Sequence, residues 1–538
     1  MKVGKKKNRS LRKLMYLIPV SALLGVPITA NAKEYTYPLP TGEALTKFDS
    51  IAPPSDTYVV NDIDSPTLDR YLFRGDSGGF DITIPINVRR YVGNVDKLLE
   101  TGLISPTFKI YIPAFDVDGD KKSFDCDNDG IIDNFDSEVN VVYFNEVAIG
   151  VLKGENNKWH FNDQFELDIK KLHFPRSEGD IGYNTINIKI DVANENVLTS
   201  SGQVGCKVWA TKLDWAAVRF EVTSPVAFVP GFFNNANWFE ASGYDDALMN
   251  STGLPSEAIE HSFFVSSFSA CSPEIIPSLT AHAEEMRNTL KAFAEKYGTD
   301  AVHLIAHSKG GLDSRVFLKK LVKKPLFVQV GEMGGQPVQV ELSVESLVMH
   351  SSPHLGSVVA DVILVRGVPF SSYFVADSCD LTTRVMQQVN KDLKSPPVGI
   401  TTLLIGADAD QNSDGQIDAN EAAGNPVGEG VSTIFYGWLR DIASVYIKYE
   451  FDPFLDRVVP VVVEIPTAFP QPNDTVVTIK SAFATRFSFN SNFPALWANG
   501  TKKFVGSVGK NHATVLDWSV QNFVIEQGLT GVLNWSLR

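Results

Sequence analysis

The stretch AVHLIAHSKGGLDSR, residues 301–315, carries a serine between His307 and Lys309, and two glycines follow it. The apolar run before Ser308 is typical of a buried strand, and the residues after Gly311 continue at helical spacing. A serine on a sharp turn between a strand and a helix exposes its hydroxyl group, and small neighbours are needed because backbone passes close by. We therefore interpret Ser308 as a candidate nucleophile, against the alternative of a surface serine in a glycine turn.

A nucleophilic serine needs a base to remove its proton, an acid to orient that base, and N–H donors for the oxyanion that develops on the substrate. The chain has 9 histidines and 63 acidic residues, so residue type alone does not choose among them. The choice depends on the elements that would place these side chains beside the serine.

The first half of the chain, residues 33–223, shows a period of two. Apolar and polar residues alternate in segments that Gly, Asn and Asp turns separate, namely 80–91, 108–118, 139–152, 186–193 and 206–222. Because no long helical period lies among them, we predict an all-β sandwich domain, of which a jelly roll is one form. Residues 142–169 are similar to a strand pair of galactose-binding-like sandwich modules, which implies a carbohydrate or polymer contact through this domain.

The pattern changes at Ser224 and Pro225, after which short apolar runs alternate with helix-like segments. The segment from Leu279 to Tyr297 has apolar residues at helical spacing and is followed by Gly298, a typical C-cap residue. Strand-like runs lie at 225–231, 301–308, 346–352 and 400–407. Strands that alternate with helices form a parallel sheet covered by helices, so residues 224–538 are predicted to be an α/β domain.

The segment VHLIAHSKGG resembles the nucleophile turn of the α/β-hydrolase superfamily, and specifically that of bacterial secreted lipases. Ala306 stands where the motif has its first glycine, a difference of one methyl group. The resemblance implies that the backbone N–H of Lys309 is one oxyanion donor. The other would be the N–H of Phe232 in VAFVPGFFNNANWF, where Pro230 and Gly231 replace a His-Gly of the lipases. The alternative for this second segment is an ordinary turn from a strand into a loop.

The order of the catalytic residues along an α/β-hydrolase chain is serine, acid, histidine, so the resemblance implies a base that follows Ser308. His350 and His354 lie in MHSSPHLGS, which is similar to a lipase segment, and we expect structural hydrogen bonds from them. His512 in GKNHATVLD is then the expected general base.

Two aspartates compete for the role of the acid. Asp474 in PNDTVVTIKSA and Asp456 in FLDRVVPVV both precede a Val-Val pair, as lipase acids often do. Only Asp474 has the preceding Asn and the following Ser-Ala that complete the lipase pattern NDxVVxxxSA. The resemblance therefore favours Asp474, with Asp456 as the alternative.

Two acidic segments follow the spacing of EF-hand loops, in which oxygens at alternate positions converge on one Ca²⁺ and the sixth residue is glycine. In the segment DQNSDGQIDANE the ligands would be Asp410, Asn412, Asp414, Gln416, Asp418 and Glu421. In DCDNDGIIDNFD, which resembles thrombospondin type 3 and dockerin loops, they would be Asp125, Asp127, Asp129, Ile131, Asp133 and Asp136, with Asp116, Asp118 and Asp120 as further ligands. We expect two structural calcium sites; the alternative is a pair of solvated acidic loops.

Residues 1–32 have the form of a secretory signal peptide. A basic start precedes the mostly apolar segment 14–28, and Ala30-Asn31-Ala32 is a small-x-small cleavage site. Prolines and a glycine interrupt the apolar segment, which argues against a membrane anchor. We therefore expect a secreted or periplasmic protein that is cleaved after Ala32.

Removing residues 1–32 takes away seven basic residues and no acidic ones, which raises the acidic excess from 15 to 22. This balance repels nucleic acid and anionic membranes and suits cation binding, and we expect no stable membrane insertion. In an exported chain the cysteines are disulfide candidates, namely Cys126, Cys206, Cys271 and Cys379. Of the three connectivities, Cys126–Cys206 with Cys271–Cys379 keeps each bridge within one predicted domain.

Together these features predict a secreted, calcium-binding carboxylic ester hydrolase, most similar to a triacylglycerol lipase. Residues 356–394 include an apolar stretch that is either a lid over the site or a buried core helix. One alternative function is cleavage of a polyester or a bulky natural ester held by the β-domain. An alternative from another class is an extracellular adhesin or binding protein whose hydrolase domain is inert.

Overall fold

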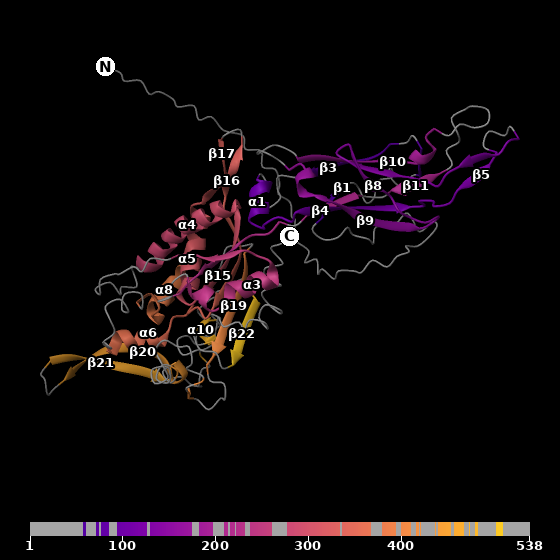
Figure 1. The fold of residues 1–538 in the computed structure, drawn as a ribbon. Helices are drawn as coiled ribbons and strands as arrows, with labels where there is room; N and C mark the ends of the chain where they lie inside the picture. The colour runs from indigo at the N-terminus through magenta and orange to yellow at the C-terminus, as the bar shows by residue number, and fades with distance from the viewer. Residues whose placement is uncertain are drawn as a thin grey trace, which may run out of the picture.

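The computed structural model shows strands gathered in one elongated N-terminal part and an α/β arrangement in the rest of the chain (Figure 1). The residues that it describes are 57–60, 71–74, 77–84, 94–125, 130–174, 182–196, 209–213, 216–220, 222–231, 237–260, 277–333, 336–366, 379–393, 400–409, 416–418, 420, 436, 439–452, 457–466, 473, 479–482 and 502–508. The proposed signal peptide therefore lies outside the described residues.

Two antiparallel sheets make up most of the N-terminal part. The six-stranded sheet contains β1 (Thr57–Val60), β2 (Tyr71–Phe73), β4 (Thr107–Phe115), β9 (Trp159–Asp168), β11 (Ala210–Leu213) and β12 (Ala216–Arg219). The four-stranded sheet has the order β3 (Ser77–Ile84), β10 (Gly182–Lys189), β7 (Val141–Phe144) and β8 (Val147–Val151). Apolar side chains of both sheets share one core, in which the rings of Phe108 and Phe144 lie 5.2 Å apart. The alternation of apolar residues thus places one face of each sheet inward.

Some elements of this part were not expected from the sequence. A short hairpin pairs β5 (Lys122–Phe124) with β6 (Asp133–Phe135), and 3-10 turns lie at η3 (Ile169–Lys171) and η4 (Val192–Asn194). The helix α1 (Val95–Glu100) begins after Asn94, whose side chain accepts the Lys97 N–H at 3.0 Å. Beyond α1, the hydroxyl of Thr101 donates to the Tyr297 carbonyl at 3.4 Å, so this corner contacts the C-terminal part.

A six-stranded parallel sheet organises the C-terminal part. Its order is β14 (Ser256–Ala258), β13 (Val226–Val229), β15 (Ala301–His307), β18 (Ser343–His350), β19 (Thr401–Asp408) and β22 (Lys502–Val508). Every neighbouring pair in this sheet is parallel, so all the strands end at one edge, called here the carboxyl edge. The parallel sheet predicted for residues 224–538 is confirmed for the described strands.

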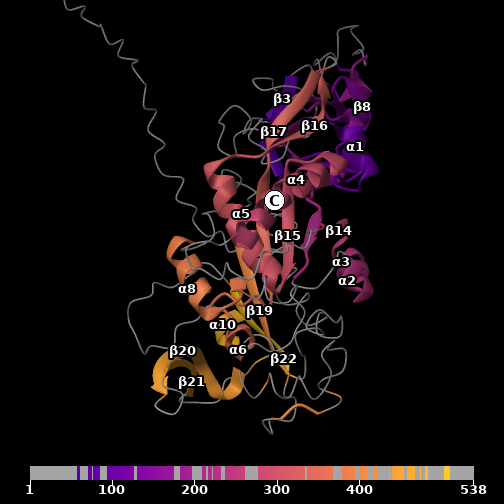
Figure 2. The same cartoon turned by 90° about the vertical axis from the view of Figure 1, so that its left-hand side faces the viewer.

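Helices cover both faces of the parallel sheet. Buried residues of α4 (Pro277–Tyr297) and α5 (Lys309–Lys323) form one core with alternate strand residues such as Leu304. The other strand residues, such as Ile305, pack with α2 (Asn237–Ala241) and α3 (Tyr244–Thr252). Figure 2 shows α5 and α3 on opposite sides of β15. The predicted helix 279–297 corresponds to α4, and Gly298 follows it with φ +69°, as a C-cap glycine should.

Two antiparallel hairpins interrupt this α/β alternation, and the sequence reading did not foresee them. The first pairs β16 (Phe327–Met333) with β17 (Gln336–Glu341), and the second pairs β20 (Ile442–Asp452) with β21 (Arg457–Pro466). The remaining helices are α6 (Val358–Arg366), α8 (Thr383–Asp392) and α10 (Ile479–Ala482). The first residues of α6 are buried, which fits a core helix better than a lid; residues 367–378 lie outside the described part. No helix among the described residues is long and apolar enough to cross a membrane.

Candidate active site

Ser308 occupies the turn between β15 and α5. Its backbone has φ 51° and ψ −127°, a conformation that glycine adopts freely and other residues adopt at a cost of about 1–3 kcal/mol. The Ser308 N–H donates to the His350 carbonyl at 2.8 Å, which ties the turn to the end of β18. Only 4% of Ser308 is exposed, so the alternative of a surface serine in a glycine turn does not fit.

The two glycines after Ser308 let α5 start close to the sheet. A Cβ atom on Gly310 would lie 2.5 Å from the carbonyl oxygens of Val229 and Pro230. A Cβ atom on Gly311 would lie 2.0 Å from the Ser352 hydroxyl. Both distances are far below van der Waals contact, so the Gly-Gly pair is a steric requirement of this turn.

The end of β13 passes directly against the candidate nucleophile. A Cβ atom on Gly231 would lie 2.6 Å from the Ser308 Cβ and 2.9 Å from the His307 carbonyl oxygen. Pro230 and Gly231 therefore stand where a segment carrying an oxyanion donor has to be. Phe232, the expected second donor, lies outside the described residues, and the role of the Lys309 N–H as the first donor stays a prediction.

If the site hydrolyses esters, as the sequence resemblance implies, replacing Gly231 with alanine should slow that turnover while the protein stays folded. The added methyl group would push the β13 end away from Ser308, and a displaced donor costs about 100-fold in kcat. The measurement is kcat for a p-nitrophenyl ester, with unfolding followed by circular dichroism. Gly119→Ala is the matched control, because nothing lies within 4 Å of its Cβ position and its φ is not left-handed. Equal kcat values in Gly231→Ala and the parent would contradict this position for the donor segment.

Five histidines of the α/β part are described, and one of them, His307, is fully buried at the end of β15. The other four contact side chains of other residues: His282 contacts Lys309, His303 contacts Ser346, His350 contacts Tyr244 and His354 contacts Arg315. Burial lowers the pKa of His350 to about 3, and burial with the charge of Arg315 lowers that of His354 well below its ordinary value. His350 and His354 are therefore neutral side chains in the core, as expected for structural roles.

The segment that contains Asp474 begins and ends at the carboxyl edge. The Asn473 carbonyl accepts the N–H of Ala409, the residue after β19, at 2.8 Å. At the ninth position of the NDxVVxxxSA pattern, the Ser481 hydroxyl accepts the Leu355 N–H at 3.0 Å and donates to the Gly356 carbonyl at 2.7 Å. Asp474 itself lies outside the described residues, so its role stays a prediction that these flanking contacts favour.

The alternative acid, Asp456, falls in the connection 453–456 between β20 and β21, also outside the described residues. Those two strands pair with each other and not with the parallel sheet. The Val-Val pair after Asp456 thus belongs to a separate hairpin, which weakens its similarity to a lipase acid.

The expected base, His512, also lies outside the described residues. It follows β22, which pairs in parallel with β19 up to the contact of Asp408 with Val508. The chain therefore reaches the carboxyl edge four positions before His512. This is consistent with its predicted role and leaves that role a prediction.

The N-terminal acidic segment, predicted to be a calcium loop, is described at residues 125 and 130–136. Gly130, the sixth position, has φ +88°, and its N–H donates to the Asp125 carboxylate at 2.8 Å. Asp133 is buried, but the Asp136 carboxylate forms an ion pair with Lys121 at 2.6 Å. A calcium ion bound at the twelfth position would have to displace Lys121 from Asp136.

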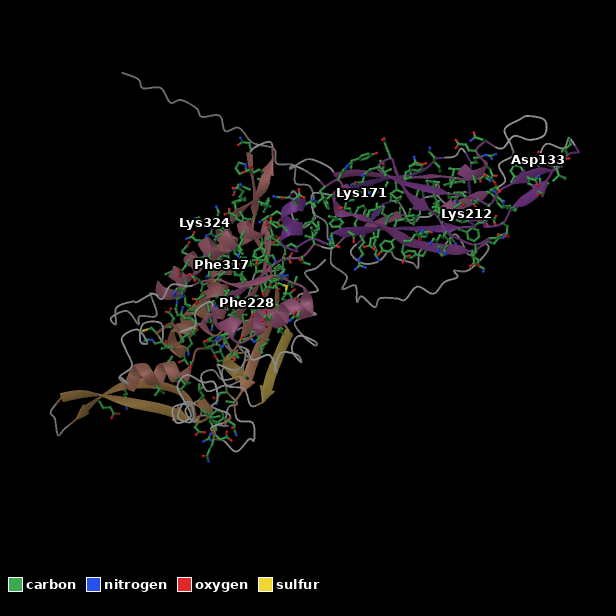
Figure 3. The ribbon with its side chains drawn as sticks, in the orientation of Figure 1. Asp133, Lys171, Lys212, Phe228, Phe317 and Lys324 are labelled. Atoms are coloured by element: carbon green, nitrogen blue, oxygen red, sulfur yellow. The ribbon has the colours of Figure 1, made fainter. Side chains whose placement is uncertain are left out.

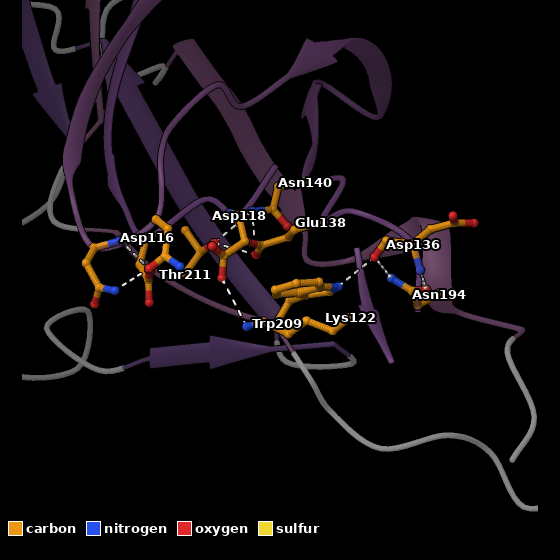
Figure 4. Close-up of polar contacts among 11 residues, drawn as sticks. Asp116, Asp118, Lys122, Asp136, Glu138, Asn140, Asn194, Trp209 and Thr211 are labelled. Atoms are coloured by element: carbon orange, nitrogen blue, oxygen red, sulfur yellow. Dashed lines mark hydrogen bonds and ion pairs between the residues drawn. The ribbon is translucent and has the colours of Figure 1, made fainter. Parts of the chain in front are cut away.

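Asp118, expected as an added calcium ligand, belongs to a buried polar network (Figure 4). Its N–H donates to the Glu138 carboxylate at 2.8 Å, and its own carboxylate pairs with Lys122 at 3.5 Å. Asn140 and Thr211 also donate to Glu138. Burial raises the pKa of Asp118 and of Glu138. The network therefore satisfies Glu138 within the protein, and Asp118 is better described as part of it than as a free ligand.

The C-terminal acidic segment is described only at a few positions. Ile417, the eighth residue of the loop, is buried against Ala409 and Tyr436, and the Asp418 carboxylate accepts the Asn420 N–H at 2.7 Å. The expected ligands Asp410, Asn412, Asp414 and Glu421, like Asp127 and Asp129 of the other loop, lie outside the described residues. Within the described part of the chain, no group of three or more His, Cys, Asp or Glu residues could hold a metal ion. Both calcium sites therefore stay predictions.

The two acidic segments lie in different parts of the molecule. Figure 3 labels Asp133 at the far end of the N-terminal part, away from Phe228 and Phe317 in the α/β part. An ion at that end could stabilise the β-part but could not act on a substrate at Ser308. Cys379 is disulfide-bonded, and Cys126, Cys206 and Cys271 lie outside the described residues, so the predicted pairing is untested.

The sequence reading assigned only the backbone of Lys309 and missed its side chain. The Lys309 ammonium is buried, 2.6 Å from His282 Nδ1 and 3.0 Å and 3.2 Å from the two carboxylate oxygens of Asp313. The four-residue spacing of Lys309 and Asp313 was a readable signal for this pair. Nothing in the sequence pointed to His282, which comes from α4.

A cavity of about 560 Å³ lies beside the edge strand β14, away from the nucleophile. Its lining includes Phe239, Glu240, Asp245, Glu257 and Lys296, and it does not include Ser308 or Gly231. We therefore do not take it as the substrate site.

Neither a protein-family model nor a curated protein matches this chain. Among solved structures, the mature Bacillus licheniformis lipase BlEst2 aligns with 13% identity, 58% of this chain and 92% of that chain covered, and a TM-score of 0.35. Phospholipase PlaB from Legionella pneumophila aligns with 14% identity, 57% and 64% covered, and a TM-score of 0.27. A carboxylesterase structure from Nitrososphaera gargenis aligns with 10% identity, 58% and 91% covered, and a TM-score of 0.26. Because these TM-scores are low, the function has to be argued from the residues of this chain.

Proposed function

We propose that the chain is a secreted serine carboxylic ester hydrolase of the α/β-hydrolase superfamily, most similar to a triacylglycerol lipase. The observation that supports this best is the strained, buried Ser308 between a parallel strand and a helix, with Gly231 against its Cβ. The nucleophile of an α/β-hydrolase adopts a strained backbone of this kind because the sharp turn between strand and helix presents its hydroxyl group at the sheet edge.

In the proposed mechanism, Asp474 orients His512, which takes the proton of Ser308 as the hydroxyl oxygen attacks the ester carbonyl. The N–H groups of Lys309 and Phe232 stabilise the resulting oxyanion. The alcohol leaves with a proton from His512, and water then hydrolyses the acyl-enzyme by the same route. The mature chain would begin after Ala32, with a β-sandwich at residues 33–223 and the catalytic domain at 224–538.

The experiment that tests this function combines covalent labelling with a substrate series. A fluorophosphonate should modify Ser308 and no other residue, as peptide mass spectrometry would show, and ester turnover should disappear in proportion to labelling. The rates for p-nitrophenyl esters from short to long acyl chains would then separate a lipase from an esterase, since equal rates count against a lipase. A purified parent protein with neither labelling nor turnover would favour an inert binding protein instead.

Removing calcium should destabilise the protein without changing the chemistry of the site. We propose that the acidic loops at 125–136 and 410–421 each hold a structural Ca²⁺ that neutralises crowded carboxylates. A chelator should lower Tm by on the order of 5 °C, since saturating one site stabilises a domain by about 3 kcal/mol. Calcium, and not magnesium, should restore the parent Tm.

The variant Asp125→Asn should lose part of this calcium-dependent shift in Tm, because it removes a charge from the first ligand position. Asp163→Asn is the control, since Asp163 is an exposed carboxylate on β9 and lies in neither loop. A Tm that is the same with calcium and with chelator would contradict both sites.

A further inference from the structure

Lys309 follows the nucleophile in the chain, yet its side chain points into the protein. The Lys309 side chain is 2% exposed, the Asp313 side chain 3% and the His282 side chain 6%. A buried ammonium is costly unless charges and hydrogen bonds compensate it. Here the Asp313 carboxylate balances the charge, and His282 Nδ1, at 2.6 Å, has the lone pair that accepts the third bond.

The cluster of Lys309, Asp313 and His282 joins the first turns of α5 to α4. Lys309 is the first residue of α5, Asp313 lies one turn further along that helix, and His282 belongs to α4. The side chain of Lys309 is therefore fixed to the next turn of its own helix and to the neighbouring helix. These contacts limit the positions that the Lys309 backbone can take while the ammonium stays bound.

The peptide group between Ser308 and Lys309 is the one that needs such restraint. Ser308 holds it in a strained conformation, and its N–H is the proposed donor to the oxyanion. The Ser308 N–H is held by the His350 carbonyl, and the Ser308 carbonyl, which belongs to this same peptide group, accepts the Gly311 N–H at 3.1 Å. The Lys309 side chain adds a further restraint, which acts on the residue that carries the donor N–H.

We propose that the Lys309–Asp313–His282 cluster is a positioning device for the oxyanion donor: it holds the Ser308–Lys309 peptide so that the Lys309 N–H points at the substrate oxygen. This inference rests on the proposed function, because it assigns a task within that reaction. None of the three side chains contacts the substrate, so they are positioning residues and not catalytic residues.

The test uses two variants of the full mature chain. Lys309→Met removes the ammonium at similar length, and Asp313→Asn removes the balancing charge without touching Lys309. Both should lower kcat per titrated active site by about 10- to 100-fold and leave KM within about threefold, because misplaced donors weaken only transition-state binding. The inhibition constant of a trifluoromethyl ketone, whose adduct carries an oxyanion, should rise by the same factor as kcat/KM falls.

Lys320→Met is the matched control. Lys320 lies on the same helix and pairs with Glu284 at 2.9 Å, but on the surface, so its kcat and ketone inhibition should equal those of the parent. Lys309→Arg keeps the charge and should recover part of the loss seen in Lys309→Met.

Several results would overturn the positioning role. One is an unchanged kcat in both variants, and another is a change in KM without a change in kcat. A third is a smaller number of titratable active sites with a normal kcat per site, which would mean that the cluster only stabilises the fold. If Lys309→Met does not fold, the isosteric Asp313→Asn decides between the same outcomes. Failure of the proposed function looks different, since the parent would then show no fluorophosphonate labelling at Ser308 and no turnover to perturb.

Discussion

Ser308→Ala should abolish ester hydrolysis, lowering kcat/KM by at least about 10⁴-fold, and leave the protein folded. Activity is lost because no other oxygen nucleophile stands at this turn. The fold should survive because the Ser308 side chain does not cap α5 and alanine adopts the same strained backbone at a similar cost. The measurements are p-nitrophenyl ester turnover and the thermal unfolding midpoint of the same preparation.

Ser351→Ala provides a closely matched control for this prediction. Ser351 is also buried, also has a positive φ, of 46°, and follows β18, the strand next to β15. The difference is that Gly231, at the end of β13, packs against the Cβ atom of Ser308. Turnover by Ser351→Ala should stay within a few-fold of the parent, so a selective loss at Ser308 would identify the nucleophile. Full activity in Ser308→Ala would rule out the proposed mechanism.

The nucleophile turn was predictable because its causes are local. An apolar strand, a serine and two glycines follow one another in the chain, and the steric need for Gly310 and Gly311 arises within a few residues of Ser308. The predicted strands and the helix 279–297 likewise follow from hydrophobic periodicity. In the structure, the apolar residues of these elements pack on the two faces of the parallel sheet.

The features that the sequence did not reveal depend on contacts between distant segments. His282 lies 27 residues from Lys309, and only the packing of α4 on α5 brings them together. The hairpins β16–β17 and β20–β21 have apolar runs like those of the parallel strands, so their antiparallel pairing could not be told from residue pattern. Asp118 and Glu138 look like loop carboxylates in the sequence, and only tertiary structure buries them.

The choice between Asp474 and Asp456 as the acid of the triad can be tested directly with two variants. Asp474→Asn should lower kcat by about 10⁴-fold, because an amide in place of the carboxylate favours the wrong tautomer of the histidine base. KM should change little, since the acid contacts the base and not the substrate. Asp456→Asn should keep parent-like activity, because Asp456 lies in the connection of a separate hairpin.

The same pair of variants distinguishes an orienting acid from a structural one. If Asp474 only held its segment in place, its loss would lower Tm and the number of titratable sites while each remaining site kept the parent kcat. If Asp474 orients the histidine, the number of titratable sites should stay normal. Each site should then react slowly with the fluorophosphonate and have a low kcat. The neighbouring contacts support the second outcome, because Asn473 and Ser481 already fix the segment to Ala409 and Gly356 without the Asp474 side chain. The opposite result, in which Asp456→Asn abolishes turnover and Asp474→Asn does not, would contradict this assignment. The catalytic acid would then come from the β20–β21 hairpin, and the lipase pattern at residues 473–482 would have no catalytic role.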